Sequence, residues 1–216
     1  MMVSLSRDEF NKLVLIAMWL TIALFVGIVS LRLWMGLELL TAAIQAISLS
    51  IFLSTTILFF CMNRTWKWKW LARLAKRPIV HGVWWGEIKP IYQGAPIPAI
   101  PIAFVIRQRY ASLSIQSFTA SIPADSTIEV FERSDKNTDV YLKYVYQMTR
   151  DANAENKATI GYGRLKLELG GKVLDGSYWT NSPTSGQIRL QLVSRDCDEV
   201  NCFESAKRAL DKSGFA

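Results

Sequence analysis

Residues able to bind metal or to act as nucleophiles are few in this chain of 216 residues. It has a single histidine, His81, and three cysteines, Cys61, Cys197 and Cys202. A structural zinc site takes four such ligands, and one histidine with a single cysteine pair falls short of that number. An odd number of cysteines without regular spacing also argues against a disulfide framework. We therefore expect no metal site and three reduced thiols, as in the cytosol.

Catalytic motifs are missing as well. The segment Gly161–Leu165 reads GYGRL, which lacks the spacing and the following helix of a phosphate-binding loop. No G-x-S-x-G turn occurs, and His81 has no evident nucleophile partner. Glu168 and Asp175 fall on the polar face of strand-like runs or near a turn, which does not suit a catalytic carboxylate pair. The sequence therefore favours a binding protein without a cofactor over an enzyme.

Aromatic and hydroxyl side chains are better candidates, and they belong to a series of short strands that begins near Ile79. Turn-forming residues separate eight segments in which apolar and polar residues alternate. The expected strands are 81–89, 99–108, 112–118, 127–132, 139–148, 159–168, 173–180 and 186–193, with 94–96 and 123–125 among the turns. This pattern predicts an all-β domain, a compact eight-stranded antiparallel β-barrel wide enough for one small ligand. Weak helical character at 199–212 predicts a short C-terminal helix.

The alternation assigns each side chain to one face of the barrel. The more apolar phase, placed inside, carries Trp84, Gln108, Tyr144, Tyr146, Tyr178 and Thr180. The opposite phase, placed outside or at the rim, carries Arg107, Arg109, Arg164, Lys166 and Arg189. Glycines in the interior phase leave room for a ligand or permit a sharp bend.

Two hydrophobic runs precede the strands. Leu13–Leu31 contains no charge and spans roughly 28 Å as a helix, close to the thickness of a bilayer core. Leu37–Met62 is long enough to span with some tilt. The four or five residues that join these runs predict a transmembrane hairpin of two helices. The expected domains are a tail (1–12), the hairpin (13–62), a linker (63–78) and the barrel with its C-terminal helix (79–216).

Positive charge orients the hairpin. The N-terminal tail holds Arg7 and Lys12, six further basic residues fall between Arg64 and Arg77, and the turn holds Arg32 alone. Because positive charge marks the cytoplasmic side, we expect both termini and the barrel in the cytoplasm of a cell whose inner membrane holds the hairpin.

Two segments near the hairpin are candidate contact sites. Alternating aromatic and basic residues predict an anchor at the membrane interface, rather than a site for a DNA or RNA polymer, at Trp66, Lys67, Trp68, Lys69 and Trp70. Gln45, Ser48 and Thr55 fall on one side of the second helix. Polar groups in lipid seek partners across helices, so this side serves either packing within the hairpin or self-association of several copies.

A helical hairpin followed by a compact barrel resembles the two-transmembrane β-barrel effectors of CBASS antiphage systems. In the barrel the resemblance rests on four fragments and their order. These are Trp84-x-Gly86-x-Ile88-x-Pro90, Leu142-x-Tyr144-x-Tyr146, Gly161-x-x-x-Leu165-x-Leu167, and Leu174-x-Gly176-x-Tyr178-x-Thr180 followed by Gly186-x-Ile188-x-Leu190. One departure is Ser182, at a position where the family pattern has a basic residue.

The resemblance implies a receptor-effector that works with a CD-NTase, an enzyme that makes cyclic oligonucleotide signals. A cyclic dinucleotide would bind the barrel, and the protein would then oligomerise and disrupt the inner membrane in an abortive infection. The chemistry of such a ligand suits the candidate residues, since bases stack on aromatic rings and phosphates pair with arginine. The expected contacts are Trp84, Tyr144, Tyr146 and Tyr178 for bases, Arg107, Arg109 and Arg189 for phosphates, and Gln108 and Thr180 for base edges.

Two other functions remain open from the residues alone. A membrane-tethered barrel that binds a lipid or fatty acid predicts an apolar interior and no basic rim. A protein adaptor predicts a filled interior and a contiguous exposed apolar patch. A cavity in the barrel would therefore separate nucleotide binding and lipid binding from the adaptor function. Positive charge at the rim would separate nucleotide binding from lipid binding.

Overall fold

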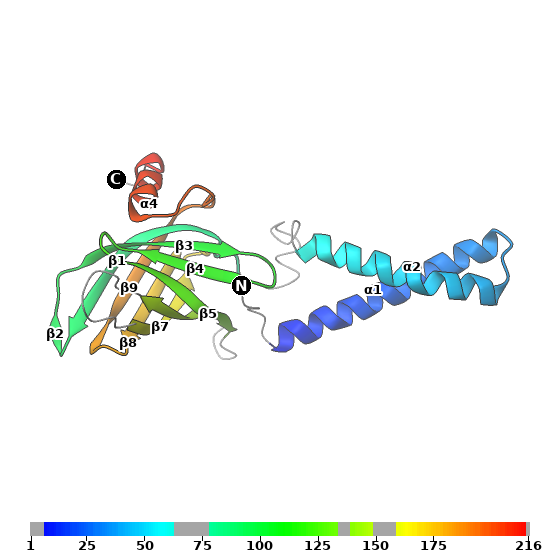
Figure 1. Ribbon diagram of the computed structural model, residues 1–216, viewed down its shortest axis with the longest axis horizontal. Coiled ribbons are helices and arrows are strands. Elements are labelled where there is room, and N and C mark those ends of the chain that lie inside the picture. The colour runs from blue at the N-terminus through cyan, green and yellow to red at the C-terminus, as the bar shows by residue number, and fades with distance from the viewer. Residues whose placement is uncertain (1–6, 63–77, 134–138, 149–158, 215–216) are drawn as a thin grey trace. The chain divides into compact units, whose positions relative to one another are not determined.

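The computed structural model describes residues 7–62, 78–133, 139–148 and 159–214, and its helices and its barrel form two separate units. The helical unit holds α1 (Arg7–Trp34) and α2 (Leu39–Phe60), joined by a turn in which Gly36 has φ +85°. That left-handed conformation suits glycine and ends α1. Both helices are long and apolar enough to cross a membrane. The predicted pair of apolar helices is confirmed (Figure 1).

The helices pack through small residues. Ala42, Ala46, Ser50 and Ser54 recur every four positions on α2 and are its buried residues. A hydrogen bond of 2.9 Å joins the hydroxyls of Thr21 on α1 and Ser54. Small side chains allow two helix backbones to approach closely, and buried hydroxyls then find partners across the helix pair.

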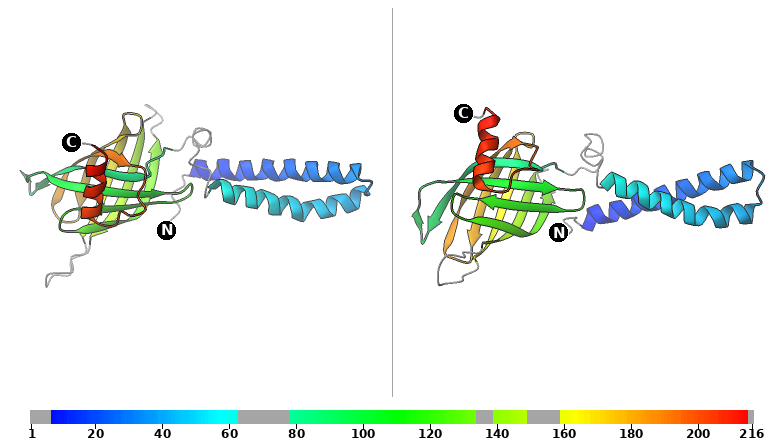
Figure 2. Two further views of the ribbon diagram at one scale, coloured as in Figure 1. Left: turned by 90° about the horizontal axis from the view of Figure 1, so that it is seen from above. Right: turned by 45° about the horizontal axis from the view of Figure 1, so that its top comes forward.

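The second unit is an antiparallel barrel, as the sequence predicts. Its strands are β1 (Gly82–Tyr92), β3 (Ile100–Gln108), β4 (Leu113–Phe118), β5 (Pro123–Arg133), β6 (Val140–Met148), β7 (Thr159–Glu168), β8 (Val173–Thr180) and β9 (Thr184–Ser194). Each pairs with the next, and the pairing of β1 with β9 closes the barrel. Figure 2 shows the closed wall from two sides. A short strand, β2 (Ala95–Pro96), extends the sheet beyond β1.

Two predicted turns are wrong. Residues 94–96 belong in part to β2, because Gln93 (φ +49°) and Gly94 (φ +84°) together make the tight turn between β1 and β2. The segment 123–125 opens β5 and pairs with β4. Pro123 is acceptable there because the first residue of a strand can lack an N–H donor.

The predicted interior phase is confirmed. The main core contains Trp84, Phe104, Leu142, Leu165 and Leu190 within the barrel. A second apolar cluster lies on the outside, where α4 (Phe203–Lys212) covers Val83, Ala103 and Val105. The predicted C-terminal helix is therefore present and packs against the outer wall.

Candidate functional site

A cavity of about 650 Å³ occupies one end of the barrel. This volume lies within the range of small-molecule sites. The connection from β4 to β5 and the connection from β8 to β9 both contribute to its lining, so the cavity belongs to the barrel end at which these connections lie. The lining residues are Ile88, Ile102, Phe104, Ser117, Thr119, Ile122, Ala124, Tyr144, Tyr146, Met148, Thr159, Tyr178, Thr180, Asn181, Ser182, Pro183, Thr184 and Ile188.

Three tyrosines form one wall of the cavity, and each lies over a glycine on the neighbouring strand. The cross-strand pairs are Tyr146 with Gly161, Tyr144 with Gly163, and Tyr178 with Gly186. A Cβ added at any of these glycines would lie less than 3.0 Å from the tyrosine ring. Because these three positions on β7 and β9 carry no side chain, the tyrosine rings can lie along the barrel wall rather than across its interior.

The tyrosine rings also contact one another. The Tyr144 ring packs edge-on to Phe104, with 5.7 Å between centroids, and lies 5.7 Å from the ring of Tyr146. Burial raises the pKa of Tyr144 well above its usual range, and burial also raises the pKa of Tyr146 and of Tyr178. All three phenols are therefore neutral at physiological pH, and each keeps an O–H donor beside an aromatic face.

Hydroxyl and amide groups surround the other side of the cavity. The Thr180 hydroxyl donates to the Ser182 carbonyl oxygen at 2.6 Å, which fixes the turn between β8 and β9. The Asn181 side-chain oxygen accepts the N–H of Ile160 at 3.1 Å. These bonds hold the polar residues of the turn against the ends of β7 and β8, so the polar lining has a defined shape.

The structure brings four of the nine predicted ligand contacts together in this cavity: Tyr144, Tyr146, Tyr178 and Thr180. Two others lie deeper and in structural roles. Trp84 is fully buried and its indole N–H donates to the Val80 carbonyl oxygen at 2.8 Å. The Gln108 side chain accepts the N–H of Val80 at 2.8 Å and donates to the carbonyl oxygen of Pro78 at 2.9 Å. Both side chains bind the segment that enters β1.

The three predicted arginines lie outside this cavity. The Arg107 guanidinium donates to the carbonyl oxygen of Val200 at 2.9 Å and holds the segment that precedes α4. Arg109 is exposed in the turn between β3 and β4, where its backbone N–H donates to Ser112. Arg189 is exposed on the outer face of β9 and borders a shallow groove with Trp85 and Glu87. Strand alternation sends Arg107 and Arg189 outward, away from the tyrosines, and Arg109 lies beyond the end of β3.

Sequence reasoning missed the residues of the mouth. Asn181, Ser182 and Thr184 line the cavity although 181–183 reads only as a turn. The position of a turn at the end of a barrel is the signal that could have found them, because loops at barrel ends surround any opening in the interior. Ser182, where the resemblance implies a basic residue, is itself one of these lining residues.

One buried carboxyl group faces inward beside the tyrosines without lining the cavity. Glu129 on β5 is only 6 % exposed and pairs across the strands with Tyr144. The Ser126 hydroxyl accepts the N–H of Ile115 at 2.8 Å and donates to the Glu129 carboxyl. Burial raises the pKa of Glu129. Ser126 and Glu129 thus connect β4 to β5 beyond the end of their backbone hydrogen-bond ladder, since on β4 that ladder covers only Gln116 to Phe118.

Of the two groups of contact residues predicted near the hairpin, the structure describes one. Gln45, Ser48 and Thr55 are exposed on α2, while the residues that pack on α1 are Ala42, Ala46, Ser50 and Ser54. The predicted interface residues Trp66, Lys67, Trp68, Lys69 and Trp70 lie outside the described residues.

The cavity offers aromatic faces, hydroxyl groups and one amide. Among its described lining residues there is no lysine, arginine or histidine. The described parts of the chain also hold no group of three or more histidine, cysteine, aspartate or glutamate residues placed to share a metal ion. This arrangement suits stacking and hydrogen bonding to a neutral or partly exposed ligand.

Comparison with known proteins gives one informative match. No protein-family model matches the chain. The chain is 28% identical over 188 residues to CD-NTase-associated protein 15 of Staphylococcus schleiferi, which covers 86% of this chain and 98% of that protein. A match of this length takes in α2 and most of the barrel strands. The chain is thus similar over most of its length to a CD-NTase-associated protein, and the family resemblance expected from its sequence is confirmed.

Proposed function

We propose that this protein is a membrane-anchored receptor-effector of antiphage defence. Its barrel binds a cyclic dinucleotide made by a CD-NTase, several copies then associate, and their helices disrupt the inner membrane. The tyrosine-walled cavity is the observation that carries the ligand part of this proposal. The homology to a CD-NTase-associated protein supports the place of the chain in a CBASS system.

The cavity suits flat bases. The rings of Tyr144, Tyr146 and Tyr178 lie along the wall because glycines face them, so their faces are available for stacking. Stacking of a base on an aromatic side chain contributes about 1–3 kcal/mol. Thr180 and Asn181 add hydrogen-bonding groups for base edges. The phosphates of such a ligand would lie toward the open end, since the described lining has no cation.

The second helix suits association in the membrane. At about 100° per residue, Gln45, Ser48 and Thr55 lie on the side of α2 opposite to the small residues that pack on α1. Their exposure within one chain leaves Gln45 and Ser48 for a neighbouring copy, whereas the Thr55 hydroxyl donates to a carbonyl oxygen within α2. A single hairpin is too small to enclose a pore, so disruption requires several copies. The excess of basic residues outside the turn supports a cytoplasmic barrel with both termini on the same side.

The test is thermal unfolding of the full chain in detergent with a panel of cyclic di- and trinucleotides. A ligand at 100 times its Kd adds about 2.7 kcal/mol to the free energy of unfolding. We expect one member of the panel to raise Tm, and Tyr178→Leu to abolish the shift. Arg109→Ala is the matched control, because Arg109 is exposed in a turn outside the cavity. No shift with any nucleotide in a folded sample would refute the proposal.

One observation favours a second candidate function. A cavity lined by apolar, hydroxyl and amide groups without a described cation also suits a fatty acid or a lipid tail. The same assay with fatty acids and short-chain phospholipids separates the two: a lipid would raise Tm and every nucleotide would leave it unchanged. The cavity itself speaks against the adaptor reading, which requires a filled interior.

A further inference from the structure

A β-hairpin made by the end of β1 and the short strand β2 lies beside the mouth of the cavity. Gln93 and Gly94 form its turn. In the sheet, Tyr92 on β1 lies opposite Ala95 on β2 and also opposite Thr184 on β9, which lines the cavity. Both edges of β1 are therefore paired up to the turn. Figure 1 shows β2 projecting from the barrel at this end.

Tyr92 lies on the interior side of β1. Side chains alternate along a strand, and Ile88, which lines the cavity, precedes Tyr92 by four positions with no shift of register between them. Ile91 belongs to the opposite phase and faces outward. Tyr92 and Ile91 are each 43 % exposed. The Tyr92 ring is thus placed at the rim of the mouth, just beyond the residues that line the cavity.

Hydrogen bonds hold the backbone of the hairpin in place. The Gln93 N–H donates to the Pro183 carbonyl oxygen at 3.2 Å, and the Ile97 N–H donates to the Pro90 carbonyl oxygen at 2.9 Å. Pro183 itself lines the cavity. The hairpin is therefore fixed to the turn that surrounds the mouth. A side chain on a backbone that is already ordered binds a ligand at a lower cost in entropy.

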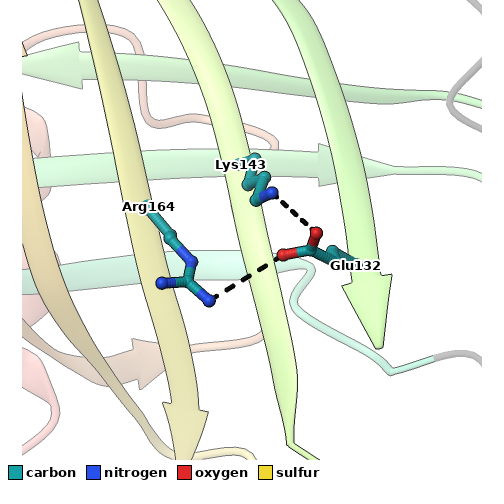
Figure 3. Close-up of polar contacts among 3 residues, drawn as sticks. All are labelled: Glu132, Lys143 and Arg164. Atoms are coloured by element: carbon teal, nitrogen blue, oxygen red, sulfur yellow. Dashed lines mark ion pairs between the residues drawn. The ribbon is translucent and has the colours of Figure 1, made fainter. Parts of the chain in front are cut away.

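Cations on the barrel wall do not take the place of this aromatic ring. On β1, Lys89 binds Glu87 at 3.2 Å. On β6 and β7, Lys143 and Arg164 bind Glu132 at 2.7 Å and 3.9 Å, as Figure 3 shows. Strand alternation places these three cations on the outer face, and each already has an acidic partner. The group that β1 presents at the rim is therefore an aromatic ring rather than a positive charge.

We infer that Tyr92 is the outer aromatic contact of the ligand. This inference rests on the proposed function, in which the ligand is a cyclic dinucleotide. The two bases of such a molecule project from opposite sides of a ring that contains both phosphates. When one base lies against the three tyrosines that line the cavity, the other is presented at the mouth, where it stacks on Tyr92.

This arrangement also accounts for the position of the phosphates. They lie between the two bases, beside the hydroxyl groups of the turn between β8 and β9, and they remain open to water. A lining without a described cation is compatible with phosphates held in this way. Because every base has a face that can stack, Tyr92 favours ligands with two bases and does not select which base is bound.

The experiment measures the Kd of the panel of cyclic di- and trinucleotides for the full chain in detergent by isothermal titration calorimetry. Tyr92→Ala removes the ring, and Tyr92→Phe retains it. Ile91→Ala is the matched control, since Ile91 is the adjacent residue, equally exposed, on the opposite face of the same hairpin. Thermal unfolding without ligand shows that each variant is folded.

For the nucleotide that binds the wild type, we expect Tyr92→Ala to raise the Kd about 5- to 150-fold, which corresponds to one stacking contact. Tyr92→Phe and Ile91→Ala should bind as the wild type does. A Kd of Tyr92→Ala equal to that of the wild type would overturn the inference and leave the proposed function standing. An equal loss in Ile91→Ala would also overturn it, because the hairpin rather than the ring would then be required. A folded wild type that binds no member of the panel would refute the proposed function, and this inference with it.

Discussion

Gly163→Ala tests whether the cavity depends on glycines that face tyrosines. A Cβ at Gly163 would lie less than 3.0 Å from the Tyr144 ring, far inside van der Waals contact. Tyr144 is only 4 % exposed and is held by the rings of Phe104 and Tyr146. The ring can move only toward the cavity, so the methyl group acts as an overpacking substitution. Such changes destabilise by about 1–3 kcal/mol.

The same displacement reduces ligand binding. A ring pushed into the cavity removes volume and one stacking face, and stacking contributes about 1–3 kcal/mol per base. The expected loss of affinity is therefore about 5- to 150-fold. The assay is thermal unfolding of the full chain with and without the nucleotide that shifts the wild type.

A double-mutant cycle separates this overlap from a general effect of alanine in a strand. In the background of Tyr144→Ala the added methyl group meets no ring, so Gly163→Ala should cost much less than in the wild type. The coupling energy should reach about 1 kcal/mol or more, as for other residues in contact. An equal cost of Gly163→Ala in both backgrounds would show that the glycine does not serve the tyrosine, and the explanation of the cavity would fail.

Three further predictions concern other parts of the chain. Glu129→Gln should become more stable than the wild type as pH rises. Because burial raises the pKa of Glu129, the stability that the protonated carboxyl group contributes is fully present below the ordinary value of 4.5 and is lost as pH rises through the pKa of the folded state. In urea unfolding at several pH values, the free energies of unfolding of the two proteins should therefore coincide at low pH and diverge at higher pH. Ser54→Ala should lower the stability of the helix pair by about 0.6 kcal/mol in detergent unfolding, whereas Thr55→Ala, whose hydroxyl bonds only within α2, should not. Arg107→Gln should cost about 1–3 kcal/mol and speed amide exchange near Val200, because the carbonyl oxygen of Val200 loses its donor; unchanged exchange there would show that Arg107 does not hold this segment.

Strand order and facing could be predicted because they depend on local alternation. Tyr144, Tyr146, Tyr178 and Thr180 meet in one cavity because each sits at an interior position on β6 or β8. The position of each residue along the barrel axis does not follow from alternation. Trp84 and Gln108 share the interior phase with the tyrosines, yet they bind the segment before β1. How far each residue lies along the barrel depends on the register between strands, which no single strand specifies.

The outward arginines illustrate a second limit. Arg107, Arg109 and Arg189 were expected to serve a ligand because phosphates attract arginine, but the strand phase directs Arg107 and Arg189 away from the interior and Arg109 lies in a turn. Arg107 instead binds a carbonyl oxygen that follows it by 93 positions in the chain. Long-range contacts of this kind leave no periodic signal in the sequence. The mouth residues Asn181 and Ser182 were missed for a related reason, since a turn motif does not state what it surrounds.

Two levels of the barrel interior differ in how they are filled, and this difference creates the site. In one part, Leu142, Leu165, Leu174 and Leu190 interdigitate and leave a solid core. In the other, Gly161 and Gly163 replace the side chains that would fill the centre, and tyrosines cover the backbone that the glycines expose. Such a glycine weakens its strand, because it gives up packing and chain entropy. With tyrosines at positions 144 and 146, any side chain larger than hydrogen at Gly163 or Gly161 would overlap the rings, so the glycines and the tyrosines depend on each other. They keep the interior open between aromatic walls, which is the arrangement that the proposed ligand requires.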